Sequence, residues 1–334
     1  MGSSVLNKLR FVVCVTVAVV LPQTARAHHG VAGLGAAGLQ GPGAPVETAT
    51  SATLPQGTTL AYLKLDHAKF KTFDTANTAE GDYSQFWMVG LGHGFTPWFS
   101  GYFFVPYNVK VDEPDGFNTR GIADFAFFGQ VGFKYDKGFR LIPANESLDD
   151  LEDWHFTVFG GASIPTGDSD LTDPAGNIDP GKSTGFGEPS YTLGVTATKT
   201  IGPRWTFDVE VSGLWFKDHE YEDGNRTKFG DEKRVNAALI YRAYTNADRK
   251  TRVDLSLEAQ YLSLGRDRTN GVDEAATGGR MIYILPGVRI YKDNYSFAFG
   301  LKKPISTSLN EEDQQQGAEG KEKYRLIFSA SALF

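Results

Sequence analysis

Apolar and polar residues alternate with a period of two over most of the chain. In one segment Phe103, Val105 and Tyr107 fall on one face, and Asn108 and Lys110 fall on the other. Because successive side chains of a β-strand point to opposite faces, this pattern predicts strands with one apolar and one polar face.

Twelve such segments follow one another, each rich in aromatic and β-branched residues. An even number is typical of single-chain bacterial outer-membrane barrels. We expect strands near residues 58–71, 83–95, 97–111, 121–135, 154–165, 189–201, 203–217, 233–246, 250–265, 279–292, 294–304 and 322–334.

The connections between these segments alternate between short and long. Short ones occur at Thr96-Pro97 and Gly202-Pro203, and the longest runs from Thr166 to Pro189. Membrane barrels have short turns on the periplasmic side and long loops outside. Residues 136–153 are an exception on the short side, and their Leu-Asp-Asp-Leu-Glu-Asp run predicts one helical turn.

The first 27 residues have the order of a secretory signal peptide. Lys8 and Arg10 precede an apolar run of eleven residues, and a small-x-small site ends at Ala27, after which we expect cleavage. The run is too short to cross a ~30 Å hydrocarbon core as a helix. It contains the only cysteine, Cys14, so disulfides and cysteine-based metal sites or catalysis are excluded from the expected mature chain.

Removing the three basic residues of this segment changes the formal net charge from −7 to −10. A chain this acidic is not expected to bind nucleic acid. No other apolar run approaches eighteen residues, which excludes a helical membrane protein. A soluble periplasmic β-protein and an outer-membrane barrel remain.

A secreted β-sandwich or lipocalin-like barrel would show the same alternation. The strand number, the terminal aromatic Phe334 and the Trp and Tyr residues near strand ends favour the membrane barrel, in which aromatic girdles lie at the interfaces. The predicted fold is an all-β, antiparallel, up-and-down transmembrane barrel of about twelve strands, with short periplasmic turns and longer extracellular loops. The expected girdle residues are Trp98, Tyr107, Tyr135, Trp205, Trp215, Tyr291 and Tyr295.

Several short motifs occur in a fixed order between residues 54 and 334. They are Leu54-Pro55-Gln56-Gly57, Gly92-His93-Gly94-Phe95-Thr96-Pro97-Trp98, Val105-Pro106-Tyr107, Gly121-Ile122-Ala123-Asp124, Ser163-Ile164-Pro165-Thr166-Gly167-Asp168 and Leu301-Lys302-Lys303-Pro304-Ile305. In this order they resemble the outer-membrane transporter-like family of the phenol meta-degradation pathway, which is distantly similar to fatty acid and aromatic hydrocarbon channels. The resemblance implies a barrel and suggests passage of small hydrophobic or aromatic molecules.

In a barrel, the polar face of each strand lines the lumen. Charges of both signs there predict either salt bridges that brace a narrow barrel or a charged constriction that selects permeants. The expected polar lining is Lys64, Asp66, Asp124, Lys134, Asp208, Glu210, Arg234, Arg242, Asp254, Glu258, Arg280, Arg289, Lys302 and Arg325.

Large apolar side chains are expected on the lumen face as well. This apolar surface predicts either an apolar permeant that uses it or a plug that covers it. Residues 28–53 are rich in Gly, Ala and Pro and cannot form a core of their own, so they are either a lumen plug or a disordered leader before the barrel of residues 54–334. The expected apolar lining is Phe86, Met88, Phe104, Phe128, Phe159, Tyr244, Met281 and Tyr283.

Two places offer metal ligands. After cleavage, His28 would carry the α-amine and could chelate copper with the help of His29. Asp168, Asp170 and Asp173 could bind Ca²⁺ in the longest loop, but the EF-hand glycine and glutamate are absent, which favours a solvated acidic loop. No other cofactor is expected.

The sequence favours transport over catalysis, because no Ser–His pair or Gly-x-Ser-x-Gly motif stands out. The first hypothesis is a passive, selective channel for small hydrophobic or aromatic molecules. The alternative is a structural or partner barrel that sheathes another exported protein without conducting solute. Expected partners are outer-membrane lipid, lipopolysaccharide, the barrel-assembly machinery and the permeant, and the protein is expected to be a monomer.

Overall fold

The computed structural model describes most of the chain from residue 43 onward. The expected signal peptide, residues 28–42 and the predicted helical turn lie outside the described residues. The described ranges are 43–71, 80–113, 117–143, 153–310 and 321–334.

Twelve long antiparallel strands close into a barrel in which sequence neighbours are also spatial neighbours. The first and last strands pair with each other, and the backbones of Thr59 and Phe334 exchange two hydrogen bonds of 2.9 and 2.8 Å. The predicted fold class is confirmed. The strands are β1 (Thr59–Phe70), β2 (Glu80–Thr96), β3 (Phe99–Glu113), β5 (Phe125–Tyr135), β7 (Trp154–Ile164), β8 (Tyr191–Ile201), β9 (Trp205–Trp215), β12 (Glu232–Asn246), β13 (Thr251–Leu264), β16 (Gly279–Lys292), β17 (Tyr295–Leu309) and β18 (Glu322–Leu333).

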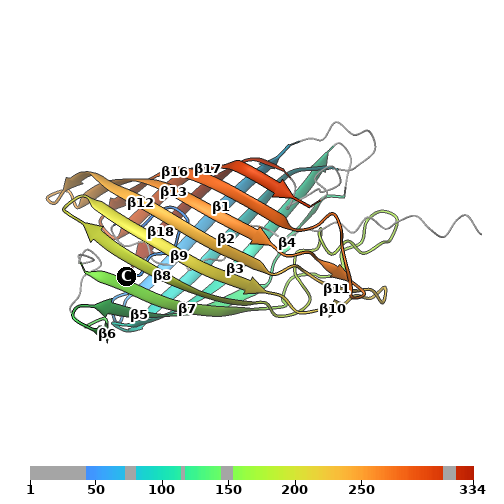
Figure 1. The fold of residues 1–334 in the computed structure, drawn as a ribbon, viewed down its shortest axis with the longest axis horizontal. Coiled ribbons are helices and arrows are strands. Elements are labelled where there is room, and N and C mark those ends of the chain that lie inside the picture. Colours follow the sequence, from blue (N-terminus) through green and yellow to red (C-terminus); the bar gives the residue numbers. More distant parts are fainter. Residues whose placement is uncertain (1–42, 72–79, 114–116, 144–152, 311–320) are drawn as a thin grey trace, which may run out of the picture.

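Short strands extend the two ends of the barrel. At one end, with the C-terminus and the short turns, β6 (Phe139–Leu141) pairs with β5. At the other end β4 (Thr119–Ile122) pairs with β3, and a small sheet forms from the long connections that follow β9 and β13 (Figure 1). That sheet contains β10 (His219–Glu220), β11 (Arg226–Lys228), β14 (Arg268–Thr269) and β15 (Val272–Asp273).

Closure has a physical cause, because hydrocarbon offers no hydrogen-bond partner to a free strand edge. Burial along β1 alternates at every residue, as expected when one face lines the interior and the other faces lipid. Among the described residues, no helix is long and apolar enough to cross a membrane.

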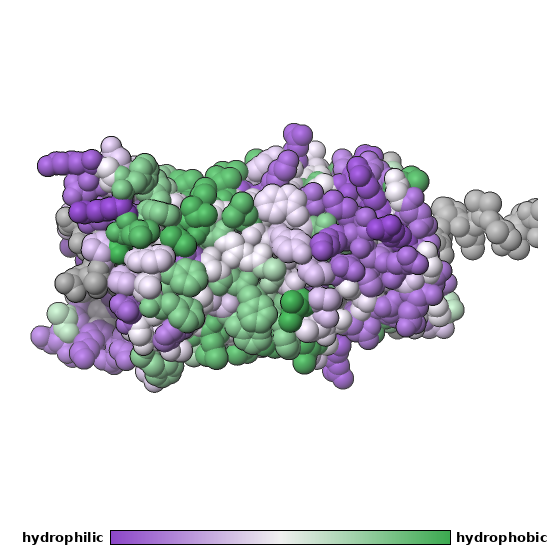
Figure 2. All heavy atoms as spheres, turned by 90° about the horizontal axis from the view of Figure 1, so that it is seen from below, coloured by the Kyte–Doolittle hydropathy of each residue, from purple (hydrophilic) through white to green (hydrophobic). Residues whose placement is uncertain are grey.

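The outer surface carries the apolar face of the strands. In Figure 2 apolar residues form a broad band toward the short-turn end, and polar residues dominate the loop end. Trp205 and Tyr295 are exposed near the short turns, and Tyr107 and Trp215 are exposed nearer the loops, as girdles would be. Tyr291 differs from the girdle prediction, because its hydroxyl accepts a 3.4 Å hydrogen bond from the Ala44 N–H inside the barrel.

The prediction that Arg280 lines the lumen is wrong. Arg280 is exposed, while its neighbour Met281 is 1% exposed and faces the interior. Since adjacent residues of a strand point to opposite faces, the two cannot both line the lumen.

Tyr244 was also expected in the lumen and instead faces outward, with 48% of its surface exposed. The register of β12 shifts between Arg242, which pairs with inward-facing Asp254, and Tyr244, which pairs with Val253. This β-bulge adds one residue and reverses the alternation, which places Tyr244 on the outer surface.

Candidate functional site

Residues 43–54 lie inside the barrel, and we call them the lumen segment. Val46, Thr48, Ser51 and Leu54 are all buried. The segment joins β1 at the end of the barrel that carries the short turns. It has no secondary structure of its own, so its backbone groups need partners on the wall.

Wall carboxylates accept hydrogen bonds from the backbone of the lumen segment. Glu258 accepts from the N–H groups of Val46 and Thr48 at 2.7 and 2.8 Å and from the Thr48 hydroxyl at 2.7 Å. Glu210 accepts from the Ala49 N–H at 3.0 Å. An ionised carboxylate is an acceptor-only group with several lone pairs, so it suits a row of backbone donors.

Wall donors bind the carbonyls of the segment in turn. The Arg289 guanidinium donates to the carbonyls of Ala44 and Pro45 at 3.2 and 2.5 Å. The Gln130 amide donates to the Ala52 carbonyl at 2.9 Å. The segment is therefore bound by specific polar contacts along its length.

Glu47 is the only charged residue of the lumen segment. Its carboxylate lies 2.9 Å from the Lys302 ammonium and 3.5 Å from that of Lys64, and the three side chains are 8%, 2% and 2% exposed. Two ammonium groups beside one carboxylate compensate its buried charge. Glu47 therefore anchors the segment near the middle of β1 and β17.

Several other charges of the wall form ion pairs. Arg325 contacts Asp66 at 3.2 Å and Glu322 at 2.6 Å, and Arg252 contacts Asp254 at 2.7 Å. Of the predicted polar lining, half-buried Arg234 and Arg242 lie on the lumen face. The buried members are Lys64, Asp66, Asp124, Lys134, Asp208, Glu210, Asp254, Glu258, Arg289, Lys302 and Arg325.

The longest loop, residues 165–190, folds against the lumen face at the other end. Asp124 accepts hydrogen bonds of 2.9 Å from the N–H groups of both Gly167 and Phe186. The Lys110 ammonium donates to the carbonyls of Gly181 and Ser183 at 2.6 and 2.7 Å. The loop is thus fixed over the mouth of the barrel, which the alternation of single strands could not predict.

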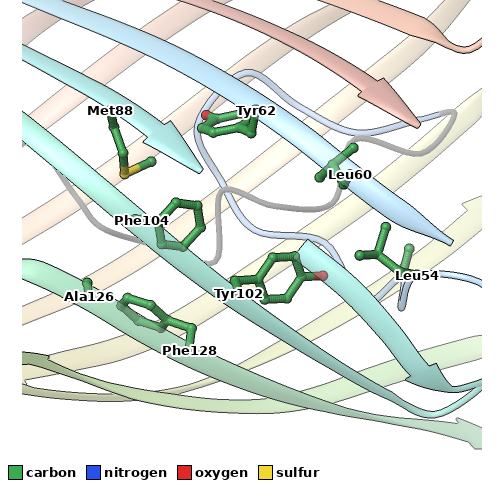
Figure 3. Close-up of a cluster of buried hydrophobic side chains, with 9 residues drawn as sticks. Leu54, Leu60, Tyr62, Met88, Tyr102, Phe104, Ala126 and Phe128 are labelled. Atoms are coloured by element: carbon green, nitrogen blue, oxygen red, sulfur yellow. The ribbon is translucent and has the colours of Figure 1, made fainter. Parts of the chain in front are cut away.

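Buried apolar side chains form several clusters inside the barrel, and two of them are larger than the others. One contains Leu54 of the lumen segment together with wall residues of β1, β2, β3 and β5 (Figure 3). Phe86 packs against it while partly buried, and Phe159 contacts Ala49 of the lumen segment. The first cluster includes Leu60, Tyr62, Met88, Tyr102, Phe104 and Phe128, and the second, on β13, β16 and β17, contains Leu262, Leu264, Met281, Tyr283 and Leu309.

Three aromatic rings meet under the loops at the mouth. Phe186 of the longest loop lies 4.8 Å from Phe216 and 5.3 Å from Phe229, measured between ring centroids. Phe216 and Phe229 are buried. We call these residues the mouth aromatics. The alternation of β9 extends to Phe216 and places it on the lumen face, whereas sequence reasoning missed Phe186 and Phe229, which come from two separate connections.

The loop carboxylates do not converge on one point. Asp173 accepts from the N–H groups of Ala175 and Asn177 at 2.8 and 2.9 Å, and Asp168 accepts from that of Asp170 at 3.0 Å. These are local loop-stabilising bonds. No group of three or more metal-ligating side chains occurs in the part of the chain that the structure describes, and His28 and His29 lie outside it.

The fold is similar to that of a solved outer-membrane β-barrel. The chain covers 98% of an outer membrane channel from Pseudomonas putida F1, with a TM-score of 0.66, 14% identity and 85% of this chain aligned. Two more distant structures have a TM-score of 0.46 and 8% identity. The NanC porin aligns with 81% of this chain and 98% of its own, and the β domain of the Bordetella autotransporter BrkA aligns with 84% of this chain and 100% of its own. The chain is an outer-membrane β-barrel protein of the Gram-negative type.

The family follows from a match over residues 74–317 to the model described as "Putative MetA-pathway of phenol degradation". The chain belongs to this family, which confirms the resemblance found in its motifs. No curated protein matches the chain.

Proposed function

We propose that this protein is a passive channel for small hydrophobic or aromatic molecules, and that the lumen segment constricts its pathway. The burial of residues 43–54 among apolar and charged wall residues is the observation that carries the proposal. The family's association with phenol degradation and the channel with a similar fold support it. A fold that channels use also favours transport over catalysis.

Apolar surface at several depths supports an aromatic permeant. The mouth aromatics lie beneath the loops, the Met281 and Tyr283 cluster lies in the wall, and the Phe104 cluster surrounds Leu54. Aromatic rings offer stacking and edge contacts that a small aromatic molecule can exchange from one site to the next.

Pairing of the wall charges supports selection for neutral solutes. Arg325, Arg252 and Lys302 each contact a carboxylate. An ion that enters would lose its hydration shell, and the charges of these pairs already have partners. A neutral aromatic molecule meets no such cost.

Liposomes that contain the purified, folded protein test the proposal. We expect phenol to enter faster than a neutral sugar, relative to liposomes without protein. A second chain that lacks residues 28–53 should admit both solutes faster, because all of the lumen segment except Leu54 is gone. Failure of both chains to increase phenol entry would contradict channel function, and equal rates for the two chains would contradict the constriction.

The bound lumen segment also favours the second hypothesis, a barrel that conducts no solute. Its backbone is held by Glu258, Glu210 and Arg289, so a sealed state is consistent with the contacts. A closed full chain that co-purifies with a stoichiometric exported partner would support this reading. Phenol entry through the full chain would exclude it.

A further inference from the structure

A row of basic side chains lies on the outer wall near the loop end. Lys233 of β12 pairs with Ser263 of β13, and Ser263 pairs with Arg280 of β16. The backbones of the two basic residues are therefore about 10 Å apart. Arg266 follows β13 in the connection above them. We call Lys233, Arg266 and Arg280 the basic row, and all three are exposed.

The basic row lies at the edge of the lipid-facing surface. Two residues further toward the barrel centre, Val235 and Ile282 are 46% and 39% exposed and apolar. Residues two apart share a face and lie about 7 Å from each other along the strand. Lys233 and Arg280 thus lie two residues beyond the apolar part of the wall, on the side of the long loops.

These bases have no carboxylate partner among the described residues, although acids are close. Lys228 contacts Asp231 at 3.5 Å, and Arg268 contacts Asp273 at 2.7 Å. No ion pair involves Lys233, Arg266 or Arg280 in the described part of the chain. A cleft of about 470 Å³ opens here, lined by Lys228, Asp231, Lys233, Ser263, Arg266 and Arg268.

We propose that the basic row binds a phosphate group of a lipopolysaccharide molecule in the outer leaflet. Guanidinium and ammonium groups form charge-assisted hydrogen bonds with phosphate, and Arg does so with two donors at once. The acyl chains of the same molecule would lie over Val235 and Ile282. A free phosphate ion would use the bases but not this apolar wall, so the position favours the lipid.

The test compares two variants of the full mature barrel with equal charge changes. The row variant carries Lys233→Gln, Arg266→Gln and Arg280→Gln. The control carries Lys199→Gln, Arg204→Gln and Arg249→Gln at the short-turn end. Retention of bisphosphorylated lipid A, and of its dephosphorylated form, is measured by native mass spectrometry, and heat-modifiable gel migration shows that each barrel is folded.

We expect the row variant to bind bisphosphorylated lipid A at least about tenfold more weakly than the wild-type and control barrels, since charge-assisted bonds are lost. The wild-type barrel should prefer the phosphorylated form. Equal binding by both variants, or equal binding of both lipids, would overturn the proposal. Displacement of the lipid by millimolar inorganic phosphate would identify a free-anion site and overturn the lipid assignment. If the triple variant does not fold, Lys233→Gln and Arg280→Gln singly provide the same comparison.

Discussion

Glu47 shows how much one residue can determine inside a narrow barrel. It comes from a segment of small residues, yet it is bound by Lys64 and Lys302 from β1 and β17. A buried ion pair contributes little net stability, but removing one partner leaves an uncompensated charge, which costs about 3–5 kcal/mol. Glu47 therefore contributes little to the stability of the barrel, and its main role is to fix the position of the lumen segment.

Glu47→Gln should loosen the lumen segment, because two buried ammonium groups would lose their carboxylate. We expect more frequent opening in planar bilayer recordings than with the wild-type barrel. Glu220→Gln, at an exposed position of the short strand β10, is the charge-matched control and should leave opening unchanged. Wild-type opening in the Glu47 variant would show that the backbone contacts hold the segment without this ion pair.

At the scale of a strand, close contacts inside the barrel depend on residues without side chains. A Cβ placed on Gly194 of β8 would lie 2.2 Å from the ring of Phe159, which contacts Ala49 of the lumen segment. A Cβ on Gly160 of the neighbouring β7 would meet its nearest atom at 3.4 Å, an ordinary contact distance. Two similar glycines thus have different packing roles.

Gly194→Ala should destabilise the barrel by about 1–3 kcal/mol, because overpacking forces the Phe159 ring to move. Gly160→Ala should have a clearly smaller effect. Urea titrations of both variants, followed by tryptophan fluorescence or gel mobility, make the comparison. An equal loss in the two variants would show that the Phe159 ring moves aside without cost.

At the scale of the whole molecule, the question is whether the lumen segment stays inside. The hydroxyl of Ser51 lies 2.7 Å from that of Thr196 on β8, so cysteines at these positions fall within disulfide reach. The only native cysteine, Cys14, lies in the expected signal peptide. The chain therefore allows a specific covalent test.

Ser51→Cys combined with Thr196→Cys should keep conductance low when oxidised and restore wild-type conductance after reduction. The control pair, Ser163→Cys with Ser190→Cys, joins hydroxyl positions 2.7 Å apart at the base of the longest loop without involving the lumen segment. Equal conductance of the oxidised and reduced Ser51 pair, at the wild-type level, would mean that the segment does not leave during conduction.

The sequence predicted the barrel well because membrane strands obey a strict local rule. Twelve segments, their alternation and the outer-membrane location could all be predicted, since lipid requires one apolar face and full pairing of the backbone. The rule failed at Tyr244, where a bulge reversed the alternation, and at Arg280, which was assigned to the same face as its neighbour Met281. Bulges depend on pairing between strands and leave no reliable local signal.

By itself, the sequence determined the strands, their order and which face meets lipid, because a period-two pattern is read residue by residue. Only the tertiary structure decided what fills the lumen. The contacts of Glu47 with Lys64 and Lys302 join residues that are separated in the sequence by 17 and 255 positions. The contacts of Lys110 with the longest loop join residues separated by more than 70 positions. Such partners are brought together by barrel closure, and no local pattern encodes which charge meets which.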